Sequence, residues 1–284
     1  MNPSAPELPS WLTECLVSDD ELARAYEDTA PKLRASCKHT LAVQHVFFGE
    51  APDWEEQRLS RSAHGFHIQS RSRPADWTLV FFDAQYASAP RLLAAVMPAL
   101  LARVPLVLCA CAPGPARPEP LCALELAGLE QIYVLNAAQS LDILRALTAQ
   151  AGQGRLVLLH KGALSALRTA ADAANLPCWE ERRAPVLRIC GHEPDVELIR
   201  QAHPDALDAL DAADAADAAD AAEDLPPDAL YCSGPDAVHT QAPLTLPPGM
   251  EGCWLHLSLT PDFFRARSLA FSLASRHPES GELP

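Results

Sequence analysis

Two side chains that can coordinate a metal, Gln201 and His203, stand two residues apart, directly before Pro204. An imidazole nitrogen and an amide oxygen are both possible zinc ligands, so the pair is a candidate metal site. On a helix, however, residues two apart point about 200° away from each other. The pair could hold one ion only if Pro204 breaks the helix, and the alternative is that His203 is a solvated histidine at a helix end.

The residues that follow this pair repeat the triplet Asp-Ala-Ala. Aspartates recur with a period of three at Asp205, Asp208, Asp211, Asp214, Asp217 and Asp220. A period of three matches neither a helix nor a strand, and it brings like charges together along a helix. No turn gathers the carboxylates into a calcium cage. We expect a solvated, partly helical spacer over 201–227 rather than a metal-binding tract.

Other chemical motifs are weak. Gly152-Gln153-Gly154 has the spacing of a phosphate-binding turn, but it precedes an apolar run instead of opening a helix after one. The nine cysteines are scattered without CxxC spacing, which predicts free thiols. Cys109 and Cys111 alternate on an apolar run, and the pattern favours a buried apolar role for them over metal binding.

Five short apolar runs alternate with amphipathic stretches between residues 75 and 200. The runs cover 77–82, 105–110, 132–136, 155–160 and 185–190, and Gly128 is placed to end one of the intervening helices. Continuous apolar strands that alternate with helices are typical of a parallel sheet covered on both faces. The fold class predicted is α/β, with a parallel sheet flanked by helices.

The flanking segments predict helical appendages at both ends. Ser18 and Glu21 form a capping box before one helix, and residues 31–48 continue as a second. Near the other end, Thr260 and Pro261 predict the start of a helix that follows a strand. The organisation expected is therefore 1–74 as helices and a strand, 75–200 as the α/β core, 201–227 as spacer, and 228–284 as a strand-helix segment.

Composition limits the possible partners. The chain of 284 residues carries a net charge of −15, which argues against binding to nucleic acid or to an anionic membrane. No apolar run reaches the length of about 20 residues that a membrane span needs, and the first residues lack a secretion signal. We expect a cytoplasmic protein.

Several segments, in the same order along the chain, resemble the histidinol dehydrogenase family. "CALELAGLEQIYVLNAAQSLDIL" (122–144) is similar to the family's "AAKLAGVDEI" and "GGAQAIAAL", and "PVLRICGHEPDVELIRQAHPDA" (185–206) is similar to the region that ends in "SQAEHDPDA". "YCSGPDAVHTQAPLTLPPG" resembles "DYIAGPNHVLPTGG", and "LSLTPDFFRARSLAFS" resembles "LSVYDFLKRTSVVELS". The resemblance implies a Rossmann-like fold of the histidinol dehydrogenase type.

The family oxidises histidinol in two NAD-dependent steps at a zinc site, beside an adjacent Glu-His pair. The family's metal-binding Gln and His are three residues apart, but Gln201 and His203 are only two apart. Leu230 stands where the resemblance implies an aspartate ligand, and no Glu-His dipeptide occurs anywhere in the chain. These departures argue against zinc and leave no catalytic residue assigned.

The resemblance implies cofactor contacts at three positions. Tyr86 matches a tyrosine near the nicotinamide cofactor, Gln139 matches the glutamine of the "GGAQ" loop, and Lys161 stands in the place of the family's "GPGN" loop. The alternatives are ordinary packing for Tyr86, a helix-start residue for Gln139 and a surface lysine for Lys161. His239 falls where the family contacts its substrate.

We therefore expect a relative without histidinol oxidation, whose α/β scaffold binds a nucleotide-like small molecule or a protein partner, and NAD is the candidate cofactor. The alternative is an NAD-dependent oxidoreductase that works without zinc. A homodimer is a further expectation, because histidinol dehydrogenases pair through their C-terminal parts.

Overall fold

A computed structural model of the chain describes residues 6–49, 51–61, 66–114, 117–150, 152–159, 164–181, 183–190, 193–206, 228–232 and 242–273. Residues 207–227 of the predicted spacer, Lys161 and His239 lie outside these ranges. Residues 201–206, which were predicted as part of the spacer, instead include the end of helix Val196–Ala202 and the buried His203 and Ala206. Within them, no helix is both long and apolar enough to cross a membrane.

The core is a parallel sheet of five strands, which confirms the predicted fold class. The strands are β3 (Trp77–Phe82), β4 (Val107–Cys111), β5 (Ile132–Val134), β6 (Gly154–Leu159) and β7 (Cys178–Glu181). Their order across the sheet is β5-β4-β3-β6-β7, and all four pairings are parallel. The fifth strand was expected at 185–190 but lies at 178–181, where the half-buried sequence "CWEE" forms the sheet edge without an apolar run.

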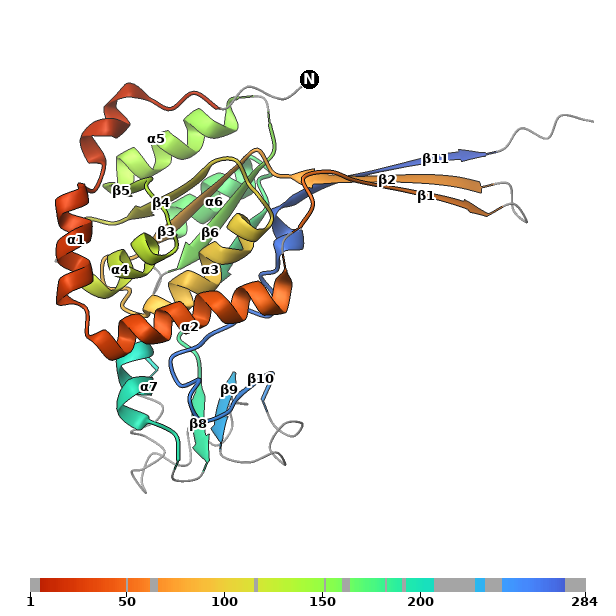
Figure 1. Cartoon of the computed structure of the whole chain (residues 1–284). Helices are drawn as coiled ribbons and strands as arrows, with labels where there is room; N and C mark the ends of the chain where they lie inside the picture. Colours follow the sequence, from red (N-terminus) through yellow and green to blue (C-terminus); the bar gives the residue numbers. More distant parts are fainter. Residues whose placement is uncertain are drawn as a thin grey trace, which may run out of the picture.

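Helices cover both faces of this sheet because each strand turns alternate side chains to opposite faces. Val80 and Phe82 of β3 pack with helices α3 (Ala89–Leu101) and α4 (Pro118–Leu126). Leu79 and Phe81 pack instead with α5 (Ala137–Thr148) and α6 (Ser165–Ala173). Figure 1 shows the resulting layers, with α3 and α4 on one side and α5 and α6 on the other.

The glycine pair before β6 has a packing role. A side chain at Gly154 would meet the Trp77 ring at 2.0 Å, so only glycine fits beside the indole. This contact explains the second glycine of Gly152-Gln153-Gly154 without any phosphate.

The N-terminal helices form as predicted. They are a short 3-10 turn, η1 (Ser10–Cys15), followed by α1 (Asp19–Asp28) and α2 (Pro31–Phe48). The capping box of Ser18 and Glu21 is present in full at the start of α1. Helix α2 lies against α3, on the outside of the core (Figure 1).

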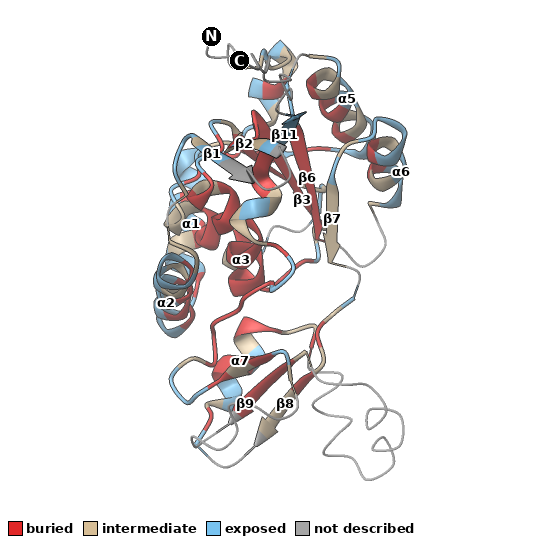
Figure 2. Cartoon of the chain, turned by 90° about the vertical axis from the view of Figure 1, so that its right-hand side faces the viewer, coloured by how far each residue is buried: buried red, intermediate tan, exposed pale blue. Residues whose placement is uncertain are grey.

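A second, smaller sheet lies beyond the core (Figure 2). It has the order β10-β9-β8, from β8 (Leu187–Cys190), β9 (Ala229–Cys232) and β10 (Leu244–Leu246), with helix α7 (Val196–Ala202) after β8. The run at 185–190 therefore does form a strand, but it belongs to this sheet and not to the core.

A three-stranded antiparallel ribbon projects from the body (Figure 1). Its order is β1-β2-β11, from β1 (Glu55–Arg61), β2 (Phe66–Pro74) and β11 (Arg265–Leu273). The expected C-terminal helix is wrong: Thr260 and Pro261 do begin a helical turn, η4 (Pro261–Phe264), but β11 follows it. Leu269, Phe271 and Leu273 alternate with small residues, and this period of two is that of a strand.

Candidate functional site

The strand order creates a crevice at the carboxyl ends of the core strands. From β3 the chain moves outward to β4 and β5, then returns to place β6 and β7 on the other side of β3. Loops that leave neighbouring strands in opposite directions open a crevice at such a switch point, which is where α/β proteins bind ligands. The loop after β3 carries Asp83, Tyr86 and Ser88 into this region.

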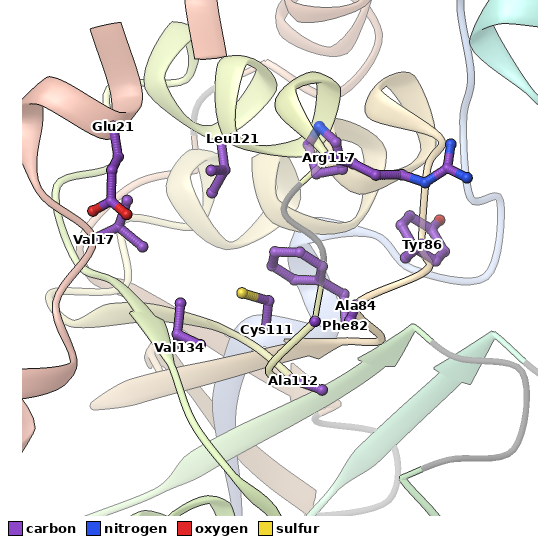
Figure 3. A pocket seen from close by; sticks show the side chains of 12 residues that line it. Val17, Glu21, Phe82, Ala84, Tyr86, Cys111, Ala112, Arg117, Leu121 and Val134 are labelled. Atoms are coloured by element: carbon purple, nitrogen blue, oxygen red, sulfur yellow. The ribbon is translucent and has the colours of Figure 1, made fainter. Parts of the chain in front are cut away.

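A hollow lies at this edge of the sheet, next to the ends of β3, β4 and β5 (Figure 3). It encloses about 510 Å³ of space between atoms, including its open mouth. A side chain on Gly114 would meet Cβ of Ala84 at 2.5 Å, so the loops after β3 and β4 approach too closely for any residue but glycine there. The walls are mostly apolar and include Val17, Phe82, Ala84, Cys111, Leu121 and Val134.

Opposite charges stand at the two sides of the hollow. Figure 3 shows Glu21 of α1 on one side, with Arg117 and Tyr86 on the other. The Glu21 carboxylate accepts a hydrogen bond of 2.9 Å from the backbone N–H of Ser18, which lowers the pKa of Glu21 and keeps it ionised. Arg117 is exposed and makes no hydrogen bond or ion pair within the described part of the chain, so its guanidinium is free for a ligand.

Arg117, rather than the start of α4, is the group at this mouth that could hold a phosphate. Arg117 is the residue before α4, and no side chain caps that helix. Pro118 and Pro120 occupy its first turn and have no N–H to donate. A phosphate here would depend on the charge and the fork of donors of the guanidinium.

Tyr86, which the resemblance made a candidate cofactor contact, lies at the same edge of the sheet. Its ring lines the hollow, and the guanidinium carbon of Arg91 lies 5.2 Å from the ring centroid. The side chain is buried, which raises its pKa well above the usual range. The hydroxyl is buried, and no residue of the described part of the chain lies in normal hydrogen-bonding geometry with it.

Gln139 lies at the start of α5 and caps that helix. Its amide oxygen accepts from the Asn136 N–H at 3.0 Å, and Asn136 caps the helix in return. Its Nε2 lies 3.3 Å from Sγ of Cys15. The helix-start alternative describes this geometry, and Gln139 does not line the hollow.

His203 is not a solvated histidine, so that expectation was wrong. The residue ends α7 and is fully buried. Nδ1 lies 3.3 Å from the Ser88 hydroxyl and Nε2 lies 3.0 Å from the Tyr231 hydroxyl. The hydroxyl of Ser88 donates to the carbonyl of Ala202, so the consistent arrangement has His203 donating from Nδ1 and accepting at Nε2.

The rest of the metal-ligand set that the resemblance implies is not assembled around His203. Gln201 points to the neighbouring turn, where its Nε2 donates to Glu197 at 3.1 Å. Leu230 is buried in β9 and has no atom that could coordinate zinc. Among the described residues, no group of three or more His, Cys, Asp or Glu side chains could hold a metal ion.

Burial fixes His203 in its neutral form. Desolvation lowers its pKa well below the usual range, and the nearby positive charge of Arg91 lowers it further. A neutral imidazole can ligate metal only through a free lone pair, and the lone pair at Nε2 is already used by Tyr231.

Sequence reasoning missed a buried polar cluster that joins the core to the smaller sheet. Its centre is Arg91 of α3, which is 1% exposed. Arg91 forms a two-fold hydrogen bond to Glu181 of β7 and another to Asp205, after α7. The signal was available, because Arg91 is the only charged residue of an otherwise apolar helix.

His256 completes this cluster. Its Nε2 donates to the carbonyl of Arg91 at 3.0 Å, and its Nδ1 accepts from the indole N–H of Trp254 at 3.2 Å. Burial lowers the pKa of His256 to about 4, so the ring is neutral near pH 7. The cluster borders a second hollow between β7 and the smaller sheet, where the ion pair of Arg183 and Asp228 also lies. This hollow measures about 890 Å³ when the open solvent at its mouth is included.

Cys111 is the thiol that lines the first hollow. Burial raises its pKa to about 11, so it is a protonated thiol near neutral pH and a poor nucleophile. Burial also raises the pKa of Cys109. The apolar role expected for both residues fits this environment.

Comparisons with known proteins give the fold but no sequence family. No family model matches the chain, and no curated protein matches it significantly. Histidinol dehydrogenase from Elizabethkingia anophelis is similar in structure, with a TM-score of 0.59 and 13% sequence identity. The alignment covers 93% of this chain and 78% of that one.

Aldehyde dehydrogenases are more distant. The substrate-bound AldH of Staphylococcus aureus aligns with a TM-score of 0.43 and 11% identity, over 92% of this chain and 84% of that one. The Mycobacterium tuberculosis aldehyde dehydrogenase complexed with NAD+ gives 0.36 and 16%, over 63% and 38%. TM-scores of 0.43 and 0.36 are too low to establish a shared fold. The chain therefore shares its fold with a histidinol dehydrogenase.

Proposed function

We propose that this protein binds a nucleotide-like small molecule, for which NAD is the first probe, and that it does not oxidise histidinol. The observation that carries the proposal is the hollow at the carboxyl ends of β3, β4 and β5, which has an apolar interior and the free guanidinium of Arg117 at its mouth. An apolar slot suits a flat base or nicotinamide, and a guanidinium suits a phosphate.

Further groups support a nucleotide at this edge. Glu21 offers an ionised carboxylate that can accept hydrogen bonds from ribose hydroxyls, and the ring of Tyr86 lines the hollow. Gln139 and Lys161 remain candidate contacts, because each follows a core strand at its carboxyl end.

The proposal that the protein does not oxidise histidinol is supported by the side chains at the positions where the resemblance implies metal ligands. The nitrogens of His203 are paired with Ser88 and Tyr231, and Leu230 is aliphatic. Positioned groups of this kind contribute about 10²-fold or more each to a reaction rate. The alternative, an oxidoreductase without zinc, would need another nucleophile or base, and Cys111 is held as a thiol.

A calorimetric titration of NAD into the full chain tests the binding half of the proposal. We expect saturable binding at one site, and Arg117→Gln should weaken it by about 10- to 100-fold, because a charge-assisted hydrogen bond to phosphate is lost. The affinity for adenosine, which has no phosphate, should not change in this variant. Arg145→Gln is the matched control, since Arg145 is an exposed arginine on α5 outside the hollow.

A wall variant locates the ligand. Val134 ends β5 and is 41% exposed on the wall of the hollow, so Val134→Trp should fill the space and abolish binding while changing stability little. An absence of saturable NAD binding, or binding that neither Val134→Trp nor Arg117→Gln alters, would refute the assignment of this site.

A further inference from the structure

The hollow at the ends of β3, β4 and β5 has opposite charges at its two ends. Among the described residues that line it, Glu21 and Arg117 are the two that carry a charge, and they stand on opposite sides (Figure 3). The space between them is mostly apolar. A ligand that spans the hollow therefore meets a negative group at one end and a positive group at the other.

The charge of Glu21 is available to a ligand. Its carboxylate accepts two hydrogen bonds, from the backbone N–H of Ser18 at 2.9 Å and from the Ser18 hydroxyl at 2.8 Å, and both go to Oε2. Arg24, one turn along α1, donates to the carbonyl of Asp20 at 3.1 Å, and within the described chain it forms no ion pair with Glu21. The second oxygen, Oε1, is therefore left for a ligand.

Of the two halves of NAD, the oxidised nicotinamide half matches the charges of the hollow. The oxidised ring is positive and its phosphate is negative, whereas adenine and the reduced nicotinamide ring are neutral near pH 7. With the phosphate at Arg117, the ring lies in the apolar part of the hollow, toward Glu21. The ribose next to the ring is then also within reach of this carboxylate.

The aromatic wall of the hollow favours the same charge. Phe82 and Tyr86 both line the hollow, and burial holds their rings in place. A cationic ring that packs on an aromatic face gains an attraction that a neutral ring lacks. The wall and the carboxylate thus act in the same direction.

We propose that this hollow binds oxidised NAD in preference to NADH, and that Glu21 is the residue that discriminates between them. The inference rests on the proposed function, because it names the form of the dinucleotide that the same site takes. Opposite unit charges about 4 Å apart favour binding by about 5-fold even in water, and by more where water is excluded. Glu21 stands at the exposed rim, so we expect NAD to bind about 5- to 10-fold more tightly than NADH. The occupancy of the protein then follows the ratio of oxidised to reduced cofactor.

Calorimetric titrations of NAD and of NADH into the full chain test the inference. Glu21→Gln should weaken NAD binding by about 5- to 10-fold and leave the affinity for NADH within about two-fold, so that the preference disappears. Glutamine keeps the capping box, so the start of α1 is preserved, which thermal unfolding checks. Glu27→Gln is the matched control, since Glu27 is an exposed glutamate of the same helix that does not line the hollow, and this variant should keep the preference.

Arg117→Gln separates the inference from the proposed function. Both forms of the dinucleotide carry the same phosphates, so this variant should weaken NAD and NADH by the same factor. Equal affinities for NAD and NADH in the wild type, or a preference that survives in Glu21→Gln, would overturn the inference and leave the NAD site standing. Tighter binding of adenosine monophosphate than of nicotinamide mononucleotide would also overturn it, because the adenine half would then occupy the hollow. A lack of saturable binding of either dinucleotide would overturn the proposed function as well.

Discussion

At the scale of single residues, His203 and His256 are the two buried histidines where the core sheet meets the smaller sheet. Both rings are buried, and each has a hydrogen-bonding partner at both nitrogens. A histidine whose two ring nitrogens are both hydrogen-bonded within the protein has a structural role, rather than the role of a metal ligand or a proton carrier. The two histidines therefore couple the stability of the protein to pH.

We expect the free energy of unfolding to fall as the pH drops. The pKa of His256 is lowered to about 4 in the folded protein, from about 6.5 in the unfolded chain. The unfolded state thus gains protons first, and the contribution of His256 is complete above about pH 6.5 and lost as the pH falls toward 4. Its size is about 3 kcal/mol, and His203 adds in the same direction.

Urea unfolding at several pH values between about 7 and 4.5 measures this effect. His256→Gln should flatten the dependence on pH while lowering the stability near neutral pH. The same slope in both proteins would show that His256 is not the group that titrates.

Arg91 should be among the most sensitive residues of the chain. Arg91→Met removes the partner of two largely buried carboxylates, Glu181 and Asp205, and should cost about 3–5 kcal/mol of unfolding free energy. The exposed Arg145→Met is the control and should cost less than about 0.5 kcal/mol. Equal losses in the two variants would contradict the role given to the cluster.

The sequence was only partly informative at this scale. It singled out Tyr86 as a candidate cofactor contact, which stays a prediction, and it showed that Gln201 and His203 lack the spacing of a metal pair. Burial of His203 could not be foreseen, because its partners Ser88 and Tyr231 are distant in sequence. Arg117 belongs to no motif, the capping box of Glu21 indicates only a helix start, and only the fold brings the two residues to one hollow.

At the scale of elements, side-chain capping fixes the start of α5. Gln139 closes the capping box at the start of α5, where it also remains a candidate ligand contact. Gln139→Ala should lower the stability by about 0.5–1 kcal/mol, whereas Gln139→Glu preserves the box and the stability. The added charge in Gln139→Glu should weaken NAD binding if Gln139 is near the phosphates.

Thermal unfolding and NAD titration of the two Gln139 variants separate the two roles. If Gln139→Glu binds NAD with unchanged affinity, then Gln139 caps the helix and does not contact the ligand.

Helices and strands were predictable from the sequence where an apolar run was long or where a helix had clear capping residues. The strands at 77–82 and 155–160, the box at Ser18 and the turn at Gly128 appear within a residue or so of their predicted places. The errors have physical causes. β7 is half polar because it is an edge strand, and β11 was mistaken for a helix because a genuine helix start at Thr260 lasts for only one turn.

At the scale of the whole molecule, three parts can be distinguished: the α/β core, the smaller sheet, and the projecting ribbon of β1, β2 and β11. The core carries the hollow, and the cluster around Arg91 joins the smaller sheet to the core. The sequence predicted the parallel sheet but not the ribbon, because strand pairing between β2 and β11 joins residues about 200 positions apart. Such pairings leave no local signal.

The proposal that this protein does not oxidise histidinol is tested most directly by an activity assay. The full chain is mixed with NAD, histidinol and zinc, and the formation of NADH is followed by its absorbance. We expect no NADH above the level seen without protein, even at protein concentrations where NAD binding is saturated. Formation of NADH that is proportional to protein and abolished by His203→Asn would contradict it, because His203 would then be acting at a metal centre and not as a buried structural histidine.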